Sequence, residues 1–242
     1  MTSRRPGKRK QLISLEEKLQ PQQSRAQDTY EIVLETAGKM LAEVGFERLT
    51  TNRICERAGI TPPALYRYFP NKYAVLKTLG ERLMTVQDDA VHSWMNSAGA
   101  GNDTLESWIT RISELQRRIF EVTRDFPGGI AIMRGVRAVP LLQKLHRDSR
   151  ESIAILMLKI LAARHPSVPR ARLHMAARVV AEMSSTMTQM ALEEPESDTE
   201  FLIYETAYLF AVYFRSFRSE PPSNLPYKAL KKGTSSRKPA TS

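Results

Sequence analysis

Two consecutive prolines, Pro62 and Pro63, restrict how the surrounding chain can fold more than any other feature of the sequence. Proline has a fixed φ and no backbone N–H, so a helix accepts it readily only in the first turn. Thr61 precedes the pair, and a residue before proline is pushed into the extended backbone that an N-cap needs. The sequence therefore predicts a short helix over residues 62–69.

The predicted helix has two unlike faces. At 100° per residue, Leu65 and Phe69 lie on one side and can pack inward. The opposite side carries small or rigid groups and one arginine, which suits a DNA groove, because Pro and Ala press on thymine methyl groups while Arg binds guanine or phosphate. The residues assigned to base edges are Pro62, Pro63, Ala64 and Arg67.

A second short helix is predicted over residues 51–58, between a threonine cap and Gly59. Two short helices joined by a glycine-containing turn are typical of the helix-turn-helix, whose second helix enters the major groove. Hydroxyl and basic groups around both helices are suited to phosphate oxygens. The further residues assigned to DNA are Thr50, Thr51, Arg53, Thr61, Tyr66, Tyr68 and Lys72.

Lys72 follows Asn71, the expected cap of the next helix. A cation in a first helical turn opposes the helix dipole, and this placement is understandable if a phosphate also binds there. A solvated lysine with a small electrostatic penalty is the alternative, and both interpretations stay open.

The rest of the chain predicts helices and almost no strands. Apolar residues recur at helical spacing in six segments, and a short helix is expected after Pro127-Gly-Gly. The late part of the 139–163 segment is apolar on every side, which predicts full burial. The expected helical segments are 25–44, 72–97, 104–124, 139–163, 169–192 and 198–218.

Charge divides the chain into three parts. Of the net charge of +10, +6 lies in residues 1–80 and +4 in residues 219–242, which favours a polyanionic partner for the basic parts. It stays open whether the terminal segments only aid solubility or whether the N-terminal arm also touches DNA. The expected organisation is a flexible basic arm over 1–23, a helix-turn-helix domain over 24–72, a helical ligand-binding and dimerisation domain over 73–218, and a flexible basic tail over 219–242.

The sequence offers little for catalysis or metal binding. Its four histidines are scattered without helical metal-site spacing, and Cys55 is the only cysteine. The apolar run over residues 153–163 is too short to span a membrane and contains Lys159. We expect a cytoplasmic protein that is not an enzyme, with no metal, no cofactor and no membrane partner.

Residues 30–79 resemble the DNA-binding domain of the TetR family of bacterial transcriptional regulators. The resemblance implies an all-α homodimer with an N-terminal three-helix helix-turn-helix domain and a helical-bundle C-terminal domain. It also implies a small-molecule pocket in that bundle and a dimer interface built from the last two long helices. Tyr73 departs from the family, which often has an acidic residue there. The resemblance is carried by Ala37, Gly45, Thr50, Thr51, Ile54, Ala58, Gly59, Ile60, Thr61, Leu65, Tyr66, Tyr68, Phe69 and Lys72.

Aromatic and methionine side chains in the second part of the chain are candidates for the lining of such a pocket, because Met adapts to irregular spaces. Plain core packing remains an alternative for each of them, and an arginine among them can meet an acidic ligand or face water. The candidates are Trp94, Trp108, Phe120, Phe126, Met133, Arg137, Met183 and Met187.

The sequence is thus interpreted as a ligand-responsive DNA-binding regulator, a repressor released from a palindromic operator by a small molecule. An activator or architectural protein of the same fold without a ligand switch is the alternative, which a filled C-terminal core would favour. An α-helical enzyme joined to a DNA-binding domain would need a buried acid–base pair, and the sequence indicates none.

Overall fold

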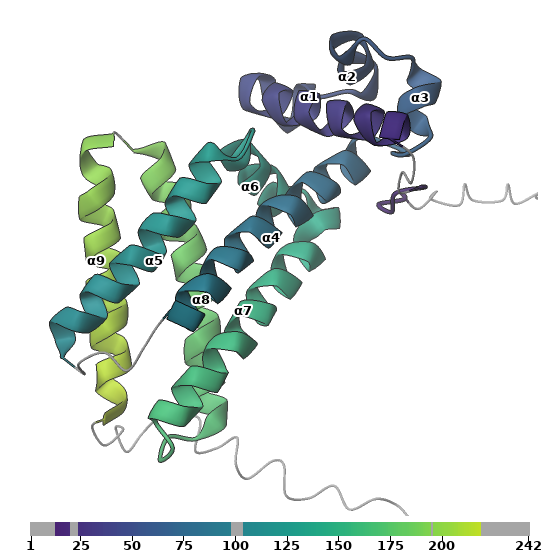
Figure 1. The fold of residues 1–242 in the computed structure, drawn as a ribbon. Coiled ribbons are helices and arrows are strands. Elements are labelled where there is room, and N and C mark those ends of the chain that lie inside the picture. Colours follow the sequence, from purple (N-terminus) through teal and green to yellow (C-terminus); the bar gives the residue numbers. More distant parts are fainter. Residues whose placement is uncertain (1–12, 20–23, 98–103, 195, 219–242) are drawn as a thin grey trace, which may run out of the picture. The chain divides into compact units, whose positions relative to one another are not determined.

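The computed structural model describes residues 13–19, 24–97, 104–194 and 196–218. These residues form helices joined by short connections and contain no strand, which confirms the expected all-α class (Figure 1). They divide into two compact units. The N-terminal unit runs to Arg82 and includes Pro127–Val139, and the C-terminal unit comprises Leu83–Phe126 and the chain from Pro140.

The N-terminal unit holds the predicted helix-turn-helix. Gly45 interrupts its first helix with a φ of 72°, at the position where the sequence predicts an end. The core of the unit is closed by fully buried side chains that include Val33, Ile54 and Phe69. The helices are α1 (Ser24–Arg48), α2 (Thr51–Ala58), α3 (Pro62–Tyr66), the first part of α4 (Lys72–Ser97), and α6 (Gly129–Ala138).

The C-terminal unit is a bundle in which α5 packs against α9 and α7 packs against α8. Its core includes Ile112, Leu158, Leu173 and Phe210, all buried. The helices are the rest of α4, α5 (Leu105–Asp125), the 3-10 turn η1 (Pro140–Leu142), α7 (Gln143–Arg164), α8 (Arg170–Glu193), α9 (Glu196–Arg215) and the 3-10 turn η2 (Ser216–Arg218).

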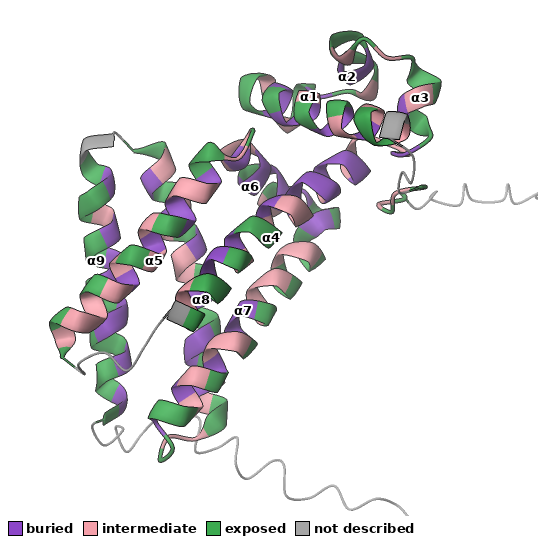
Figure 2. Ribbon diagram, in the orientation of Figure 1, coloured by how far each residue is buried: buried purple, intermediate pink, exposed green. Residues whose placement is uncertain are grey.

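Helix α7 corrects one prediction. The late part of its sequence is apolar on every side, yet only part of it is buried. Ile153 and Leu158 face the core, whereas Ile155 is 49% exposed. Figure 2 shows buried and exposed residues along the bundle helices. The helix therefore packs on one side, and its composition alone overstated its burial.

Helix α6 belongs to the N-terminal unit, whereas the sequence placed residues 127–138 in the ligand-binding domain. The reason is a close backbone approach between α1 and the start of α6. A Cβ atom added to Gly38 would lie 2.7 Å from the carbonyl oxygen of Pro127. A Cβ atom added to Gly128, whose φ is +76°, would lie 2.2 Å from the carbonyl oxygen of Gly38. Two glycines far apart in sequence thus allow the two backbones to meet.

Residues 13–19 also depart from the prediction, because they pack against the N-terminal unit as a strap instead of belonging to a flexible arm. Asn71 donates to the carbonyl oxygen of Ser14 over 2.7 Å, and the Lys18 N–H donates to the carbonyl oxygen of Tyr68 over 2.8 Å. The other predicted arm residues, 1–12 and 20–23, lie outside the described residues, as does the predicted tail over 219–242.

The Glu17 carboxylate is the side-chain anchor of the strap. Its Oε1 accepts a hydrogen bond from the Tyr30 hydroxyl over 2.8 Å and another from the Thr78 hydroxyl over 2.5 Å. Burial and the hydrogen bond to Glu17 raise the pKa of Tyr30, so this hydroxyl stays a donor. Neighbouring Glu16 meets Lys77 over 3.3 Å, and the Glu16 side chain is 80% exposed.

We expect Gly128→Ala to destabilise the protein by about 3–5 kcal/mol, because the left-handed backbone and a backbone clash add together. The matched control is Gly59→Ala. Gly59 has a φ of +66° but an added Cβ would meet nothing within 4 Å, so a loss of about 1–2 kcal/mol is expected. Urea unfolding followed by circular dichroism measures both. Equal losses would contradict the close approach of α1 and α6.

We expect Glu17→Ala to destabilise the N-terminal unit by about 1–2 kcal/mol, because it leaves the buried Tyr30 hydroxyl without its acceptor, whereas the Thr78 hydroxyl can still donate to the carbonyl oxygen of Ala74. Glu16→Ala removes only an exposed ion pair and is expected to cost about 0.5 kcal/mol or less. Hydrogen exchange of α1 and α4 amides measures both losses. If these amides are equally protected from exchange in the two variants, the carboxylate of Glu17 does not hold the strap.

Candidate DNA-binding surface and ligand cavity

The turn between α2 and α3 is built as the sequence predicts. The Thr50 hydroxyl accepts from the Arg53 N–H over 3.2 Å and caps α2. Gly59 ends that helix in the left-handed region, with φ 66° and ψ 29°. Thr61 is extended, and Pro62 and Pro63 occupy the first turn of α3. Each of these local signals acts within a few residues, so the turn needs no long-range contact to form.

Helix α3 presents the predicted outer face. Leu65 is completely buried and fixes the inner side, whereas Arg67 is exposed. The guanidinium of Arg67 lies 5.8 Å from the ring centre of Tyr68. The other exposed residues assigned to DNA on α3 and its cap are Thr61, Pro62, Pro63 and Tyr66, with Ala64 half-buried.

Two further assigned residues connect α2 to α3. The hydroxyls of Thr51 and Tyr66 share a hydrogen bond of 2.9 Å. This bond joins the start of α2 to the end of α3, so it fixes the spacing of the two helices. Arg53 is exposed beside them, and its Nη1 donates to the carbonyl oxygen of Arg48 over 3.0 Å. The remaining guanidinium donors of Arg53 are suited to an anion.

Tyr68 is a correction to the assigned set. The prediction carried the helical geometry of α3 to residue 69, but the helix ends at Tyr66. Beyond that point Tyr68 turns inward, is only 3% exposed, and packs edge-to-face on Tyr30 with ring centres 5.7 Å apart. A buried ring in this position contributes to the core, and its side chain is not available to a phosphate.

Lys72 also has a role that the sequence did not reveal. Its Nζ donates to the carbonyl oxygens of Phe46 (3.0 Å) and Glu47 (3.3 Å), and lies 4.4 Å from the ring centre of Phe46. The ammonium group therefore caps carbonyls at the end of α1, where a cation is favourable. This contact explains a lysine at the start of α4 without a bound phosphate. Asn71 caps α4 as predicted, and its Oδ1 accepts from two backbone N–H groups.

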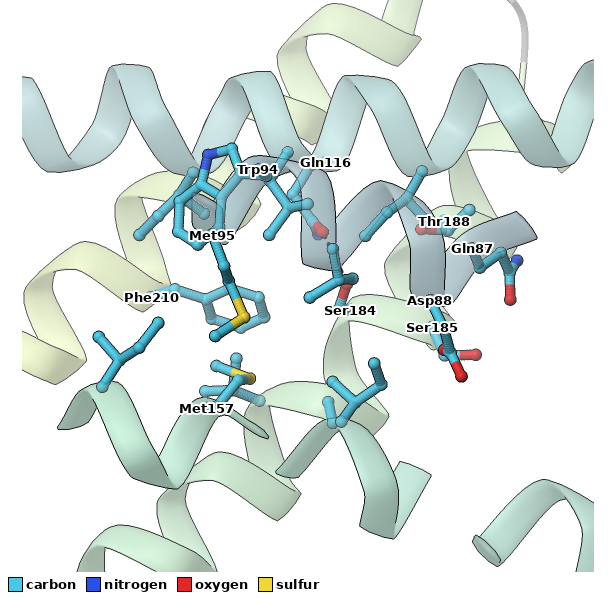
Figure 3. A pocket seen from close by; sticks show the side chains of 18 of the residues that line it. Gln87, Asp88, Trp94, Met95, Gln116, Met157, Ser184, Ser185, Thr188 and Phe210 are labelled. Atoms are coloured by element: carbon cyan, nitrogen blue, oxygen red, sulfur yellow. Dashed lines mark hydrogen bonds between the residues drawn. The ribbon is translucent and has the colours of Figure 1, made fainter. Parts of the chain in front are cut away.

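The C-terminal unit contains a cavity of about 90 Å³, lined by side chains from α4, α5, α7, α8 and α9. Its walls are mostly apolar. Figure 3 shows Trp94, Met95 and Phe210 on one side of the cavity, and Gln87, Asp88 and Ser185 on the other. A space with an apolar side and a polar side is suited to a small amphipathic molecule.

The predicted pocket residues separate into three groups. Trp94 and Trp108 line this cavity. Phe120 and Met187 line a second space of only about 10 Å³ in the same unit. The others line neither: Met183 packs against the bundle core, and Phe126 is half-buried at the end of α5. Met133 and Arg137 are corrections, because they lie on α6 in the N-terminal unit.

The sequence prediction missed the polar lining residues. The available signal was a polar residue at a core-facing position of an apolar helix. Gln116, for example, follows Ile112 by four residues on α5 and is 4% exposed. The polar lining residues that were missed are Gln87, Asp88, Gln116, Arg150, Ser184, Ser185 and Thr188.

Asp88 supplies a carboxyl group to this lining. Burial raises the pKa of Asp88 from 3.8 to about 6, although the nearby charges of Arg150 and His92 act in the opposite direction. Oδ1 of Asp88 is buried and has no hydrogen-bond partner among the described residues. In the N-terminal unit, burial likewise raises the pKa of the Cys55 thiol, which favours a packing role for that residue.

Among the described residues, none of the helices has the length and apolar character that a membrane span needs.

The exposed face of α3, held by a short turn on a second helix, defines the class of protein: an all-α regulator of the helix-turn-helix type.

Comparison with known proteins identifies the family. Residues 33–79 match the domain described as "Bacterial regulatory proteins, tetR family". Residues 106–213 match "Tetracyclin repressor-like, C-terminal domain". The chain belongs to the TetR family, whose members are DNA-binding transcriptional regulators and not enzymes.

Two curated relatives illustrate the range of the family. The tetracycline repressor protein class C of Escherichia coli is 36% identical over 121 residues, which cover 50% of this chain and 51% of that protein. The nucleoid occlusion factor SlmA of Actinobacillus pleuropneumoniae is 29% identical over 111 residues, covering 46% of this chain and 50% of that protein. The matches thus span about half the length of these relatives.

Solved structures share the fold at low identity. A TetR-family regulator from Streptomyces coelicolor has a TM-score of 0.57 and 22% identity, covering 78% of this chain and 99% of that one. The fatty acid degradation regulator FadR from Bacillus halodurans has a TM-score of 0.59 and 16% identity, covering 76% of this chain and 94% of that one. A TetR variant from Acinetobacter baumannii in complex with minocycline has a TM-score of 0.51 and 22% identity, covering 78% and 98%.

Proposed function

We propose that this protein is a homodimeric repressor that binds a palindromic DNA operator in the cytoplasm and leaves it when a small molecule occupies the C-terminal cavity. The observation that carries the DNA-binding part is the outer face of α3. Pro62, Pro63 and Arg67 project from a helix that Leu65 anchors to the core. Ala64 completes the set proposed for base edges, and Thr50, Thr51, Arg53, Thr61 and Tyr66 are proposed for the phosphates.

The buried position of Tyr68 and the carbonyl contacts of Lys72 change their proposed roles. Both are now proposed to position α3 and α4. Because Lys72 is held by two carbonyl oxygens, its loss would first loosen the end of α1. The direct electrostatic contribution to DNA affinity is therefore assigned mainly to the two arginines, Arg53 and Arg67.

Arg67→Ala is expected to weaken binding to a duplex selected by the wild-type protein by about 10- to 100-fold, and to relax the preference at one base position. The control is Arg118→Ala, which removes an arginine 64% exposed on α5 in the other unit and should leave affinity within about threefold. Fluorescence anisotropy at fixed salt measures both variants. A uniform loss on all sequences for Arg67→Ala would instead make Arg67 a phosphate contact.

Exposed apolar side chains on α8 and α9 support a homodimer through these helices. Six large apolar residues on α9 are between 37% and 66% exposed, and three more are exposed on α8. Four of those on α9 follow each other at helical spacing and form one stripe, which we call the α9 stripe. Its members are Phe201, Tyr204, Tyr208 and Val212. A contiguous apolar stripe of this kind is best explained by a self-complementary interface.

Tyr208→Asp is expected to convert the dimer to a monomer, because it places a charge within the α9 stripe. Ile155→Asp is the matched control, since Ile155 is similarly exposed but lies on α7. Size-exclusion chromatography with light scattering measures the mass of each variant. Dimers in both cases would show that α9 does not form the interface, and monomers only for Ile155→Asp would assign the interface to α7.

The cavity supports the ligand-release part of the proposal. A filled core would favour a DNA-binding protein of this fold without a ligand switch, and the similarity to the nucleoid occlusion factor SlmA keeps that second candidate in view. The cavity of about 90 Å³ favours the ligand-responsive candidate. If the protein has no ligand switch, no small molecule will change its DNA affinity. If it is ligand-responsive, at least one small molecule will lower that affinity.

A further inference from the structure

The lining of the cavity in the C-terminal unit contains few polar groups, and most of them already have partners within the protein. The Trp94 indole N–H donates to the carbonyl oxygen of Arg111 over 2.8 Å. The Ser184 hydroxyl donates to Gln116 Oε1 over 2.6 Å. The Gln87 side-chain amide donates to the Thr123 hydroxyl over 2.8 Å. These bonds orient the side chains, so these groups gain little from a ligand.

Asp88 is different. Its Oδ1 is buried without a hydrogen-bond partner in the described structure, and its side chain stands at the polar side of the cavity (Figure 3). A carboxylate oxygen without a partner is costly in an apolar surrounding, because it has lost water and gained nothing. A ligand that donates a hydrogen bond to this oxygen would remove that cost. At this end of the cavity, Oδ1 of Asp88 is thus an acceptor that a ligand can match with a donor.

We propose that the effector is a small, largely apolar amine whose ammonium group binds Asp88. The inference rests on the ligand-responsive function proposed above and gives the chemical class of the ligand. The apolar part of the amine contacts the side formed by Trp94, Met95 and Phe210. An ammonium group is a strong donor to a carboxylate, since the hydrogen bond is charge-assisted.

Arg150 raises the main competing possibility, which is an anionic ligand. It also lines the cavity, and its charge acts on Asp88. Its Nη2 donates to the Ser149 hydroxyl over 3.1 Å, whereas its buried Nε has no hydrogen-bond acceptor among the described residues. An anionic ligand would have to approach Arg150 while leaving the Asp88 oxygen buried beside a second negative charge, which is unfavourable. The ammonium group of an amine would instead be attracted to Asp88 and repelled to some extent by Arg150. The amine is preferred because a carboxylate has only two oxygens to stabilise its charge and one of them is orphaned, whereas the guanidinium charge is spread over five donors, of which one on Nη2 is already bonded to Ser149.

The size of the cavity limits the body of the ligand. A cavity of roughly 150 Å³ admits benzene, so about 90 Å³ holds a single ring only if lining side chains move. Met95 and Met157 both line the space, and methionine changes conformation at small cost. A ligand with one ring or a short branched chain is therefore expected, and a fused polycyclic body is excluded without a larger rearrangement.

The test is isothermal titration calorimetry on the full-length protein without DNA. Three probes share one ring and a short chain but differ in the head group: phenethylamine, 2-phenylethanol and phenylacetate. Phenethylamine is expected to bind at least about tenfold tighter than 2-phenylethanol, which corresponds to one charge-assisted hydrogen bond, and phenylacetate is expected to bind weakest. Tightest binding of phenylacetate, or binding by none of the three, would overturn the inference.

Two variants assign the effect to the carboxylate. Asp88→Asn keeps the shape of the side chain and is expected to lower phenethylamine affinity at least about tenfold while changing 2-phenylethanol affinity by less than about threefold. Asp89→Asn is the matched control, because Asp89 is the exposed neighbour on α4 and does not line the cavity. Equal losses in the two variants would overturn the role of Asp88. The melting temperature of each unliganded variant shows that it is folded.

The effect of a ligand on DNA affinity is measured separately from ligand binding. If phenethylamine binds through Asp88 but does not change the affinity for a selected duplex, the ligand class stands and the release mechanism is wrong. If phenylacetate binds best and releases DNA, the release mechanism stands and the amine is wrong. Calorimetry without DNA and anisotropy with DNA thus distinguish the two failures.

Discussion

The DNA-binding face depends on the turn that joins α2 to α3. Gly59 takes the left-handed backbone, Thr61 is extended, and Pro62 and Pro63 start α3 without needing N–H partners. This backbone directs Leu65 into the core, so the opposite side of a helix of only five residues must face outward. A helix this short has little stability of its own and keeps its place through the anchor and the turn. The hydrogen bond between Thr51 and Tyr66 adds a side-chain connection to α2.

In the C-terminal unit, apolar helix faces serve two purposes. One set of apolar residues fills the bundle core and surrounds a small cavity with a polar side. Another set lies exposed on α8 and α9, where a second copy of the chain is proposed to cover it. Both uses require more apolar surface than a closed bundle needs. This explains why α9 is apolar on several faces, which the sequence alone could indicate but not divide between core and interface.

Sequence reasoning succeeded where the signals are local. The limits of α2 match the prediction because Thr50 and Gly59 act within one turn. It failed for the end of α3, since helical geometry was extended past Tyr66 and Tyr68 was therefore directed outward. The position of α6 was also beyond reach, because it depends on the approach of Gly38 and Gly128, which are far apart in sequence.

The candidate sites show the same difference between features set by local signals and features set by long-range contacts. The outer face of α3 was predictable from residue spacing, because Leu65 and Phe69 set the inward direction. The cavity was not, because its lining comes from five helices whose mutual positions no local signal fixes. The candidate lining residues were chosen by type, and two of them, Met133 and Arg137, lie in the other unit. The polar residues that give the cavity its chemistry, Asp88 above all, were passed over because the sequence does not show which polar residues of a helix face the inside of the bundle.

Selection from a random pool of DNA duplexes at roughly physiological salt shows whether this protein is a dimeric, sequence-specific DNA binder. We expect enrichment of a palindrome whose half-sites lie about one helical turn, or a multiple of it, apart, because two copies of α3 must enter successive major grooves. Enrichment of single half-sites without symmetry would contradict the dimer. Enrichment of no sequence, with tight binding that disappears at higher salt, would contradict specific recognition by α3.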